Sequence, residues 1–184
     1  MKNLIIVGAS RSGKSTVAKE IAKINNMTYI PLDAFVSTLE NLYPEVGIKH
    51  LDDNLKMSIK IAVFLKELVS HLKYEDINYV IDLYQVYPKD LSDIIDPKQD
   101  LVVYFGYPNL VPKEKLEFVK KHAREKDWTR NTPDSEMIGI LELFIAENKK
   151  MHRECIEIGY PFFDTGKEFN ITIQNAIEYI LKEL

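Results

Sequence analysis

Short apolar runs alternate along the chain with longer segments whose apolar residues recur at helical spacing. The short runs predict buried strands at residues 4–7, 29–30, 79–81, 101–105 and 161–163. The longer segments predict amphipathic helices at residues 14–24, 33–43, 55–72, 112–124, 138–158 and 173–184. Strands separated by helices indicate a parallel sheet covered on both faces. The polar stretch at residues 125–133 is expected to be an exposed loop.

Length and composition are consistent with one domain of this kind. The chain has 184 residues, of which 46% are hydrophobic and 28% charged, and it shows no internal repeat or linker. We therefore expect a single α/β domain over residues 1–184. The net charge of −4 argues against a nucleic-acid partner, which usually requires a basic face. A nucleotide needs only a local positive site, so the acidic balance does not oppose nucleotide binding.

Cysteine content and the N-terminal segment bear on the cellular compartment. Cys155 is the only cysteine, so neither an intrachain disulfide nor a cysteine zinc cluster is possible. Its place in a helical segment favours packing over catalysis. The apolar run before Gly8 is too short for a signal peptide, and no segment approaches the roughly 20 apolar residues that span a bilayer. We expect a cytoplasmic protein without a membrane partner, either a monomer or a homodimer.

Residues 8–15 carry the most specific chemical signal in the chain. Their sequence Gly-Ala-Ser-Arg-Ser-Gly-Lys-Ser fits the phosphate-binding pattern G-x-x-x-x-G-K-[ST]. A chance match in a glycine-containing turn is the alternative, but an apolar strand precedes this segment and an amphipathic helix follows it. Lys14 is predicted to bind the β- and γ-phosphates, and the Ser15 hydroxyl to bind Mg²⁺. The predicted nucleotide-binding residues are Gly8, Ser10, Arg11, Ser12, Gly13, Lys14, Ser15 and Thr16. For Arg11, phosphate contact and a solvated side chain both remain open.

Three aspartates follow predicted strands, where ligands bind in open α/β sheets. Asp33 is a candidate to accept a proton from an attacking hydroxyl or to hold water on Mg²⁺; it is also a candidate N-cap for the following helix. Asp82 follows an apolar run and is predicted to contact Mg²⁺, with a plain strand-ending turn as the alternative. Asp164 is expected to shape a turn.

With these features the sequence resembles the nucleoside monophosphate kinase-like and uridine kinase-like group of small P-loop kinases. The resemblance rests on residues 8–15, on Leu32-Asp33-Ala34-Phe35 and on Val80-Ile81-Asp82. It implies a three-layer P-loop NTPase fold with a five-stranded parallel sheet ordered 2-3-1-4-5, and phosphoryl transfer from ATP with Mg²⁺ to a small acceptor. It also implies that Asp33 aligns with a proton-accepting or Mg²⁺-organising aspartate, that residues 34–75 form acceptor-binding helices, and that a short lid follows strand four.

The expected lid, residues 124–133, is rich in cations. Arg124, Lys126 and Arg130 surround Trp128 in the sequence. Cations that close over the triphosphate would neutralise charge in the transition state and exclude water, so Arg124 or Arg130 is predicted to act catalytically. The alternative is a solvated loop of mixed charge. Trp128 is expected to anchor the loop to the core rather than to stack on a base.

The acceptor and the reaction class are constrained by motifs that the sequence lacks. Asp82 is followed by Leu-Tyr-Gln rather than by the Asp-Gly-Phe-Pro-Arg segment of adenylate kinases, and residues 34–75 contain no arginine. Both observations favour a neutral or weakly charged acceptor, because bidentate arginine usually binds phosphorylated acceptors. His50 and His71 are expected to be surface or packing residues.

Proteins of other classes use the same phosphate loop. A regulatory GTPase needs Asn-Lys-x-Asp, and residues 148–151 read Asn-Lys-Lys-Met. No Leu-Ser-Gly-Gly signature of transport ATPases is present. A non-catalytic or slowly hydrolysing ATP-binding module with a regulatory role remains a second hypothesis, and the choice between ATP and GTP stays open.

Overall fold

Five parallel strands form one sheet in the order β2-β3-β1-β4-β5. The computed structural model describes residues 1–184 except 51–53, 85, 124 and 126–127. The strands are β1 (Asn3–Gly8), β2 (Thr28–Pro31), β3 (Tyr79–Leu83), β4 (Asp100–Gly106) and β5 (Phe162–Asp164). Every adjacent pair is parallel, which confirms the predicted fold class and strand order. Strand β1 lies at the centre of the sheet, so its carboxyl end lies between those of β3 and β4.

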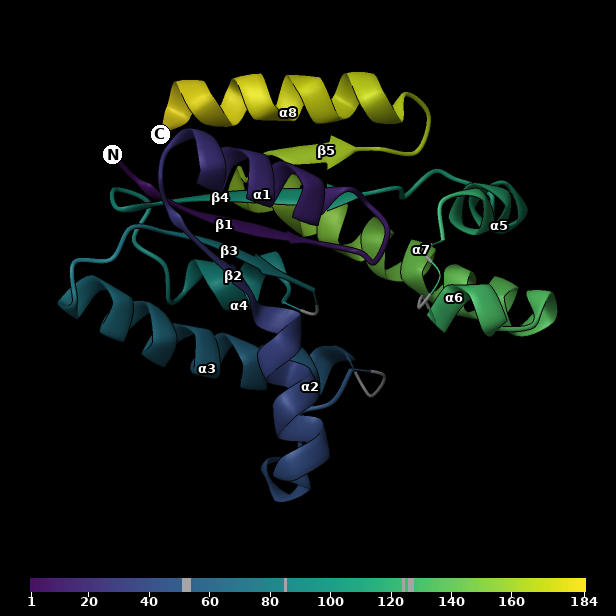
Figure 1. Ribbon diagram of the computed structural model, residues 1–184, viewed down its shortest axis with the longest axis horizontal. Coiled ribbons are helices and arrows are strands. Elements are labelled where there is room, and N and C mark those ends of the chain that lie inside the picture. The colour runs from purple at the N-terminus through teal and green to yellow at the C-terminus, as the bar shows by residue number, and fades with distance from the viewer. Residues whose placement is uncertain (51–53, 85, 124, 126–127) are drawn as a thin grey trace.

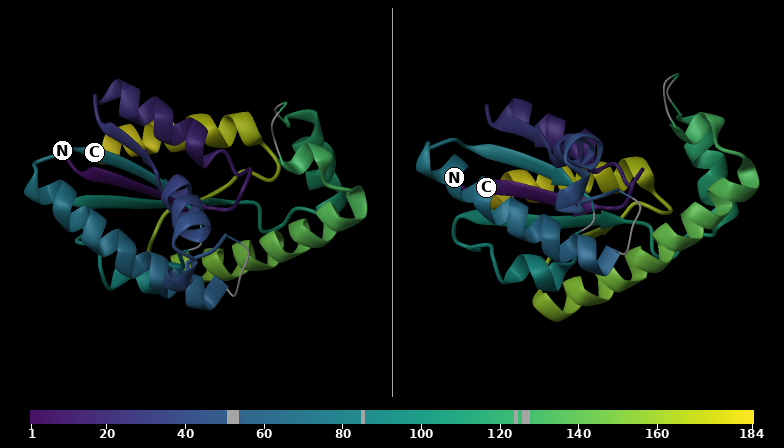
Figure 2. Two further views of the ribbon diagram at one scale, coloured as in Figure 1. Left: turned by 60° about the horizontal axis from the view of Figure 1, so that its bottom comes forward. Right: turned by 90° about the horizontal axis from the view of Figure 1, so that it is seen from below.

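Helices cover both faces of the sheet. They are α1 (Lys14–Ile24), α2 (Leu32–Leu42), the 3-10 helix η1 (Pro44–Val46), α3 (Asn54–Tyr74), α4 (Pro88–Ser92), α5 (Pro112–Lys121), α6 (Trp128–Asn131), α7 (Asp134–Ile158) and α8 (Phe169–Glu183). Helices α1 and α8 lie together on one face, and α3, α4 and α7 lie on the other (Figures 1 and 2). Helices α5 and α6 lie beyond the carboxyl ends of the strands (Figure 1).

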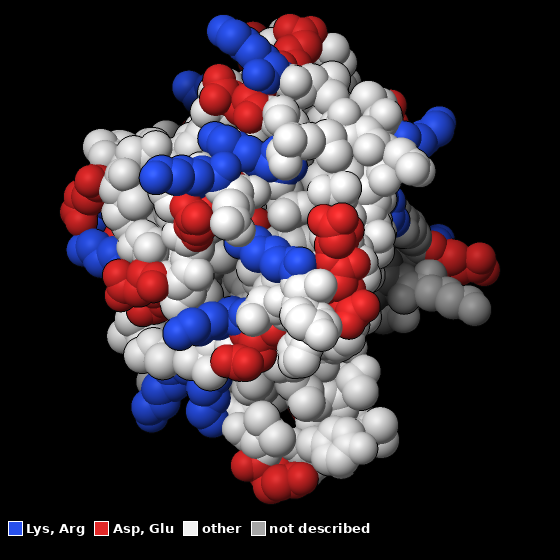
Figure 3. Space-filling model, turned by 90° about the vertical axis from the view of Figure 1, so that its left-hand side faces the viewer, with Lys and Arg blue, Asp and Glu red and all other residues white. Residues whose placement is uncertain are grey.

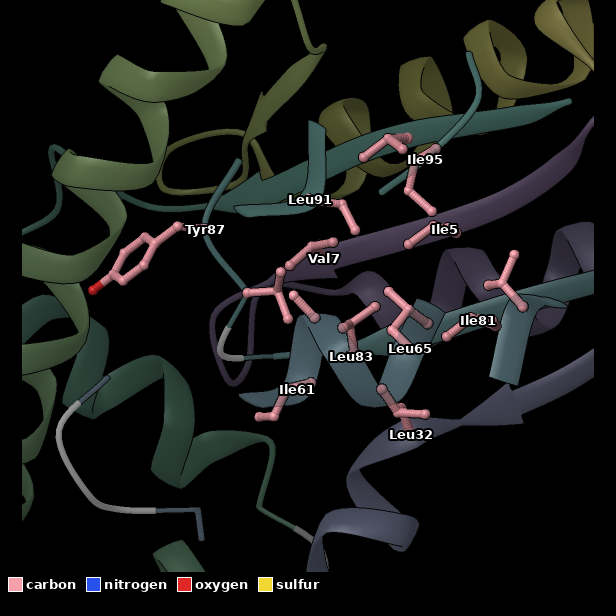
Figure 4. Close-up of a cluster of buried hydrophobic side chains, with 14 of the residues drawn as sticks. Ile5, Val7, Leu32, Ile61, Leu65, Ile81, Leu83, Tyr87, Leu91 and Ile95 are labelled. Carbon is pink, nitrogen blue, oxygen red and sulfur yellow. The ribbon is translucent and has the colours of Figure 1, made fainter. Parts of the chain in front are cut away.

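Two apolar layers hold the helices against the sheet. Alternate β1 residues point to opposite faces, so Ile5 and Val7 join the layer under α3 while Leu4 and Ile6 join the layer under α1. Figure 4 shows the first layer, in which side chains from β1, β3, α3 and α4 meet. Burial on both faces explains why the central strands are mostly apolar, with Asp82 and Asp100 as buried exceptions.

The largest difference from the sequence prediction is in the polar segment 125–133. Residues 128–131 form the short helix α6 rather than the predicted loop, and the expected exposure is wrong for Thr129, which is fully buried, whereas Arg130 and Asn131 are exposed. Helix α7 begins at Asp134, four residues before the predicted start, because Pro133 in an extended conformation precedes it. The five-residue helix α4 was not predicted, since it is too short to show a helical period.

Charge is mixed on the face that bears the two chain ends. There, lysine and arginine side chains alternate with aspartate and glutamate, and no continuous basic surface forms on this face (Figure 3). Among the described residues, no helix has the length and apolarity required to cross a membrane.

Candidate functional site

The loop between β1 and α1 depends on glycine at both ends. A Cβ on Gly8 would lie 2.1 Å from the Phe105 carbonyl oxygen, because β1 and β4 are adjacent there. Gly13 has a φ of +90°, and a Cβ on it would lie 2.5 Å from Cδ1 of Ile173. Side chains at either position would therefore move the loop away from β4 or α8. The loop ends at the N-terminus of α1, where helix N–H groups are available to bind phosphate.

Two side chains from outside the loop hold its carbonyl groups. The Tyr107 hydroxyl donates to the Ser10 carbonyl at 2.8 Å, and the Lys115 ammonium donates to the Arg11 carbonyl at 2.8 Å. Lys115 is 1% exposed and lies 3.9 Å from the centroid of the Tyr107 ring. Burial, and then the charge of Arg11, lowers the pKa of Lys115 to about 8. These contacts fix the loop from the side of α5, and sequence reasoning missed both residues because they follow β4 without any local motif.

Lys14 lies between the two aspartates predicted for the site. Its Nζ is 3.6 Å from Oδ1 of Asp82 and 3.8 Å from Oδ2 of Asp33. The strand register explains this meeting, because Pro31 on β2 pairs with Asp82 on β3 and Asp33 follows two residues later. The structure thus brings together the predicted phosphate-binding lysine, metal-binding carboxylate and acceptor-binding carboxylate.

The three charged groups differ in their access to solvent. Lys14 and Asp82 are buried, with 6% and 3% of their surface exposed, whereas 45% of the Asp33 side chain is exposed. Asp33 is in the first turn of α2, which starts at Leu32 after Pro31, and no side-chain cap is present. The N-cap interpretation of Asp33 was therefore wrong: the chain passes directly from β2 into α2, and the Asp33 carboxylate faces Lys14 instead.

Tyr29 on β2 adds a hydroxyl that sequence reasoning missed. It donates to Oδ2 of Asp82 at 3.0 Å, and the Ser15 side chain lies close to it. Burial, followed by the nearby Asp82 charge, raises the pKa of Tyr29 well above its ordinary value. The pairing of β2 with β3 places this hydroxyl beside Asp82, and no local motif in the sequence marks Tyr29 for that position.

The residues predicted to hold Mg²⁺ have suitable chemistry. Oδ1 of Asp82 is buried and has no hydrogen-bond partner among the described residues. The Ser15 side chain lies close to Tyr29, whose hydroxyl is bonded to the other oxygen of the same carboxylate. Oxygen ligands suit Mg²⁺, which commonly binds one or two protein groups together with substrate phosphates and water. No described group of three or more histidine, cysteine, aspartate or glutamate residues forms an all-protein metal cage.

A cleft of about 1000 Å³ runs along the phosphate loop. Tyr29 and Asp33 line one part of it, and Phe118, His122 and Phe169 line another. The Phe118 ring lies 4.4 Å from the His122 ring and 5.3 Å from the Phe169 ring, between centroids. A cleft with cations at a glycine-containing loop and aromatic rings beyond it suits a nucleotide.

Most of the predicted loop residues line this cleft. They are Ser10, Arg11, Gly13, Lys14, Ser15 and Thr16. Gly8 contacts β4 instead, and Ser12 is fully buried. Arg11 has a φ of +63° and donates to the Thr129 hydroxyl at 3.3 Å, so it connects the loop to α6 rather than standing free in solvent.

The predicted lid residues are only partly placed. Arg130 is exposed on α6 and is not among the described residues that line the cleft. Arg124 and Lys126 lie outside the described residues, and the Trp128 side chain is not described. Asp164 has the predicted turn role, since its Oδ1 accepts from the Gly166 amide at 2.9 Å. Cys155 is buried and packs among apolar residues, as expected.

Comparison with known proteins identifies the fold. No protein-family model matches the sequence, and no curated protein matches it. Among solved structures, shikimate kinase from Bacteroides thetaiotaomicron is similar over 100% of this chain and 99% of its own, with 14% identity and a TM-score of 0.61. Shikimate kinase from Acinetobacter baumannii in complex with shikimate covers 99% and 92%, with 14% identity and a TM-score of 0.58. A gluconokinase from Sinorhizobium meliloti 1021 covers 98% and 92%, with 15% identity and a TM-score of 0.59. At these identities the likeness establishes the fold alone: it is that of small P-loop kinases, without singling out the expected nucleoside monophosphate or uridine kinase subgroup.

Proposed function

We propose that this protein is an ATP- and Mg²⁺-dependent phosphotransferase that acts on a small molecule bearing a hydroxyl group. One observation carries the proposal: a phosphate-binding loop presents Lys14 between a buried carboxylate and an exposed one. The buried Asp82 suits a metal ion, and the exposed Asp33 is accessible to a second substrate. The kinase names of the structural neighbours are consistent with this division of roles.

Each residue has a distinct task in the proposed transfer. Lys14 and the amides at the start of α1 would hold the phosphates, while Ser15 and Asp82 would hold Mg²⁺. Bound Mg²⁺ would neutralise charge on the transferred phosphoryl group. Asp33 would orient the acceptor hydroxyl and accept its proton as the oxygen attacks the γ-phosphorus and the bond to the β–γ bridging oxygen breaks. Burial of the two side chains would strengthen the attraction of Lys14 for the phosphates and of Asp82 for Mg²⁺.

We further propose that the acceptor carries no carboxylate or phosphate. Residues 34–75, where the acceptor-binding helices are expected, contain no arginine. The cation that pairs with Asp33, Lys14, is already assigned to the phosphates of ATP. Shikimate and gluconate are acids and would need a cation here. A neutral polyhydroxylated compound would find hydrogen-bond partners for several hydroxyl groups.

A substrate screen tests the proposed reaction. ADP release would be measured with neutral polyols and nucleosides in one set, and with shikimate, gluconate and nucleoside monophosphates in another. We expect release to stay at background with ATP alone and to rise with one neutral compound. Release that is unchanged by every acceptor would favour the regulatory ATP-binding module, and activity on an acid alone would contradict the proposed acceptor class.

Two variants assign the roles within the site. Lys14→Ala should abolish turnover and weaken nucleotide binding, since it removes the phosphate-binding charge. Asp33→Asn should keep nucleotide affinity and lower the rate of transfer by roughly 10²-fold or more, as expected for loss of a general base. Full phosphotransfer by Asp33→Asn would show that Asp33 is not the proton acceptor.

As further parts of the proposal, the enzyme acts in the cytoplasm as a monomer or homodimer and binds neither nucleic acid nor membranes.

A further inference from the structure

We infer that Tyr29 is a positioning residue for the metal site, holding Asp82 in the orientation that binds Mg²⁺. The inference rests on the proposed nucleotide- and Mg²⁺-binding function but concerns a residue outside the phosphate loop. Tyr29 lies on the edge strand β2, its hydroxyl is hydrogen-bonded to Asp82, and the Ser15 side chain lies close to it.

The direction of this hydrogen bond follows from the number of protons. An ionised carboxylate only accepts, so the single proton of Tyr29 is donated to Oδ2 of Asp82 at 3.0 Å. The Tyr29 hydroxyl therefore has no proton left to donate to the neighbouring Ser15 side chain.

This direction has a consequence for metal binding. Because the Tyr29 proton is donated to Asp82, Tyr29 does not occupy a lone pair of the Ser15 oxygen, which stays available to a cation. Because Oδ2 of Asp82 is engaged, the carboxylate is held with Oδ1 turned toward Lys14 at 3.6 Å, and Oδ1 has no hydrogen-bond partner among the described residues. The phenol thus orients the carboxylate for the ion, in the way that outer-shell groups orient metal ligands elsewhere.

The variant Tyr29→Phe tests this role through binding rather than through turnover. It removes one hydroxyl and keeps the ring that Lys19 approaches at 5.6 Å. The dissociation constant of a fluorescent ATP analogue would be measured in EDTA and across a Mg²⁺ titration. We expect affinity in EDTA to stay within about twofold of wild type and the Mg²⁺ concentration at half-saturation to rise by about tenfold, the lower range for loss of an outer-shell partner.

Tyr79→Phe is the matched control. Tyr79 is also a tyrosine that donates to a buried aspartate, but its partner Asp100 lies at the amino ends of the strands, away from the phosphate loop. Both variants lose one hydrogen bond to a carboxylate, so both should lower the melting temperature, while only Tyr29→Phe should change the Mg²⁺ dependence. Tyr29→Leu provides a second variant without the hydroxyl and should show the same loss.

Each outcome decides between the alternatives. Equal Mg²⁺ dependence in Tyr29→Phe and wild type, or an equal change in Tyr79→Phe, would overturn the positioning role. A wild-type protein that binds the analogue no better with Mg²⁺ than in EDTA would instead contradict the proposed function itself. If no acceptor is phosphorylated but the Mg²⁺-linked loss appears in Tyr29→Phe, the inference holds and only the catalytic proposal fails.

Discussion

At the scale of single residues, the site depends on the unequal exposure of two carboxylates that share one lysine. Asp82 is buried on β3, the strand between β1 and β2, so its charge would be costly to leave without a partner. Asp33 is accessible, so its interaction with Lys14 is weaker and can be exchanged for contact with a substrate. The sequence indicates different roles for Asp33 and Asp82, and the structure adds that one carboxylate is exposed and the other buried.

Gly13→Ala gives a prediction at the same scale. The variant must place a Cβ at a positive φ and within 2.5 Å of the Ile173 side chain. We expect it to lower the free energy of unfolding by about 2 to 3 kcal/mol and to weaken nucleotide binding, because the loop must move. Urea unfolding and ATP titration measure the two effects.

The control for this variant is Gly139→Ala. Gly139 lies within α7, and no atom would lie within 4 Å of its new Cβ. Relief of a helical glycine should stabilise the protein by about 0.5 to 1 kcal/mol without changing ATP affinity. Equal effects of the two substitutions would show that the packing of the loop against α8 contributes neither to the free energy of unfolding nor to ATP affinity.

The residues of the candidate site that could be predicted are those that belong to a local sequence motif. Lys14 and Ser15 belong to one contiguous motif, and Asp33 and Asp82 each follow a short apolar run, so each could be identified in the sequence. Tyr29 and Lys115 make their contacts across paired strands and through the packing of α5 on the loop, and no local motif marks either residue. The alternative N-cap role of Asp33 failed because the helix begins two residues earlier than that role requires, with Pro31 at the cap.

At the scale of elements, α5 supports the phosphate loop through a buried charge. Lys115 is held against Tyr107 and the Arg11 carbonyl, and burial lowers its pKa to about 8. The pKa in the unfolded chain is about 10.4, so between these values the unfolded state binds more protons than the folded state. Stability contributed by this group therefore rises with pH from about 8 to about 10.4.

Lys115→Met isolates this contribution. The free energy of unfolding would be measured from pH 7 to pH 10 for both proteins, and the wild type should gain on the order of 1 to 2 kcal/mol relative to the variant across that range. Tyr84, whose pKa burial raises, lowers the stability of both proteins above about pH 10 and so cancels in the comparison. Parallel curves would show that Lys115 titrates alike in the folded and unfolded states.

Long elements were predictable and short ones were not. The helical period over α3, α7 and α8 extends over several turns, whereas α4 and α6 contain five and four residues. Helix α6 is defined by tertiary contact: Thr129 is buried and its hydroxyl accepts from Arg11 on the phosphate loop. The charged composition of residues 125–133 predicted exposure, and burial of one threonine among charges leaves no periodic signal.

At the scale of the whole molecule, the strand order explains why distant segments form one site. Placing β1 between β3 and β4 brings the phosphate loop beside Asp82 on one side and beside Tyr107 on the other. Helix α8, near the end of the chain, then packs on Gly13 and lines the cleft with Phe169. A ligand in this cleft would contact segments from the first turn of α1 to the start of α8, so its binding should stabilise the entire fold.

Thermal unfolding measures that stabilisation. At a concentration about 100 times its dissociation constant, Mg²⁺·ATP should contribute about 2.7 kcal/mol, which corresponds to a rise in melting temperature of about 5 to 10 °C for a chain of this size. Mg²⁺ alone should have little effect, because the phosphates would supply most of its ligands. Lys14→Ala should remove most of the rise at the same ATP concentration. A rise that persists in this variant would place the nucleotide somewhere other than the phosphate loop, since a ligand that bypasses Lys14 does not depend on its charge.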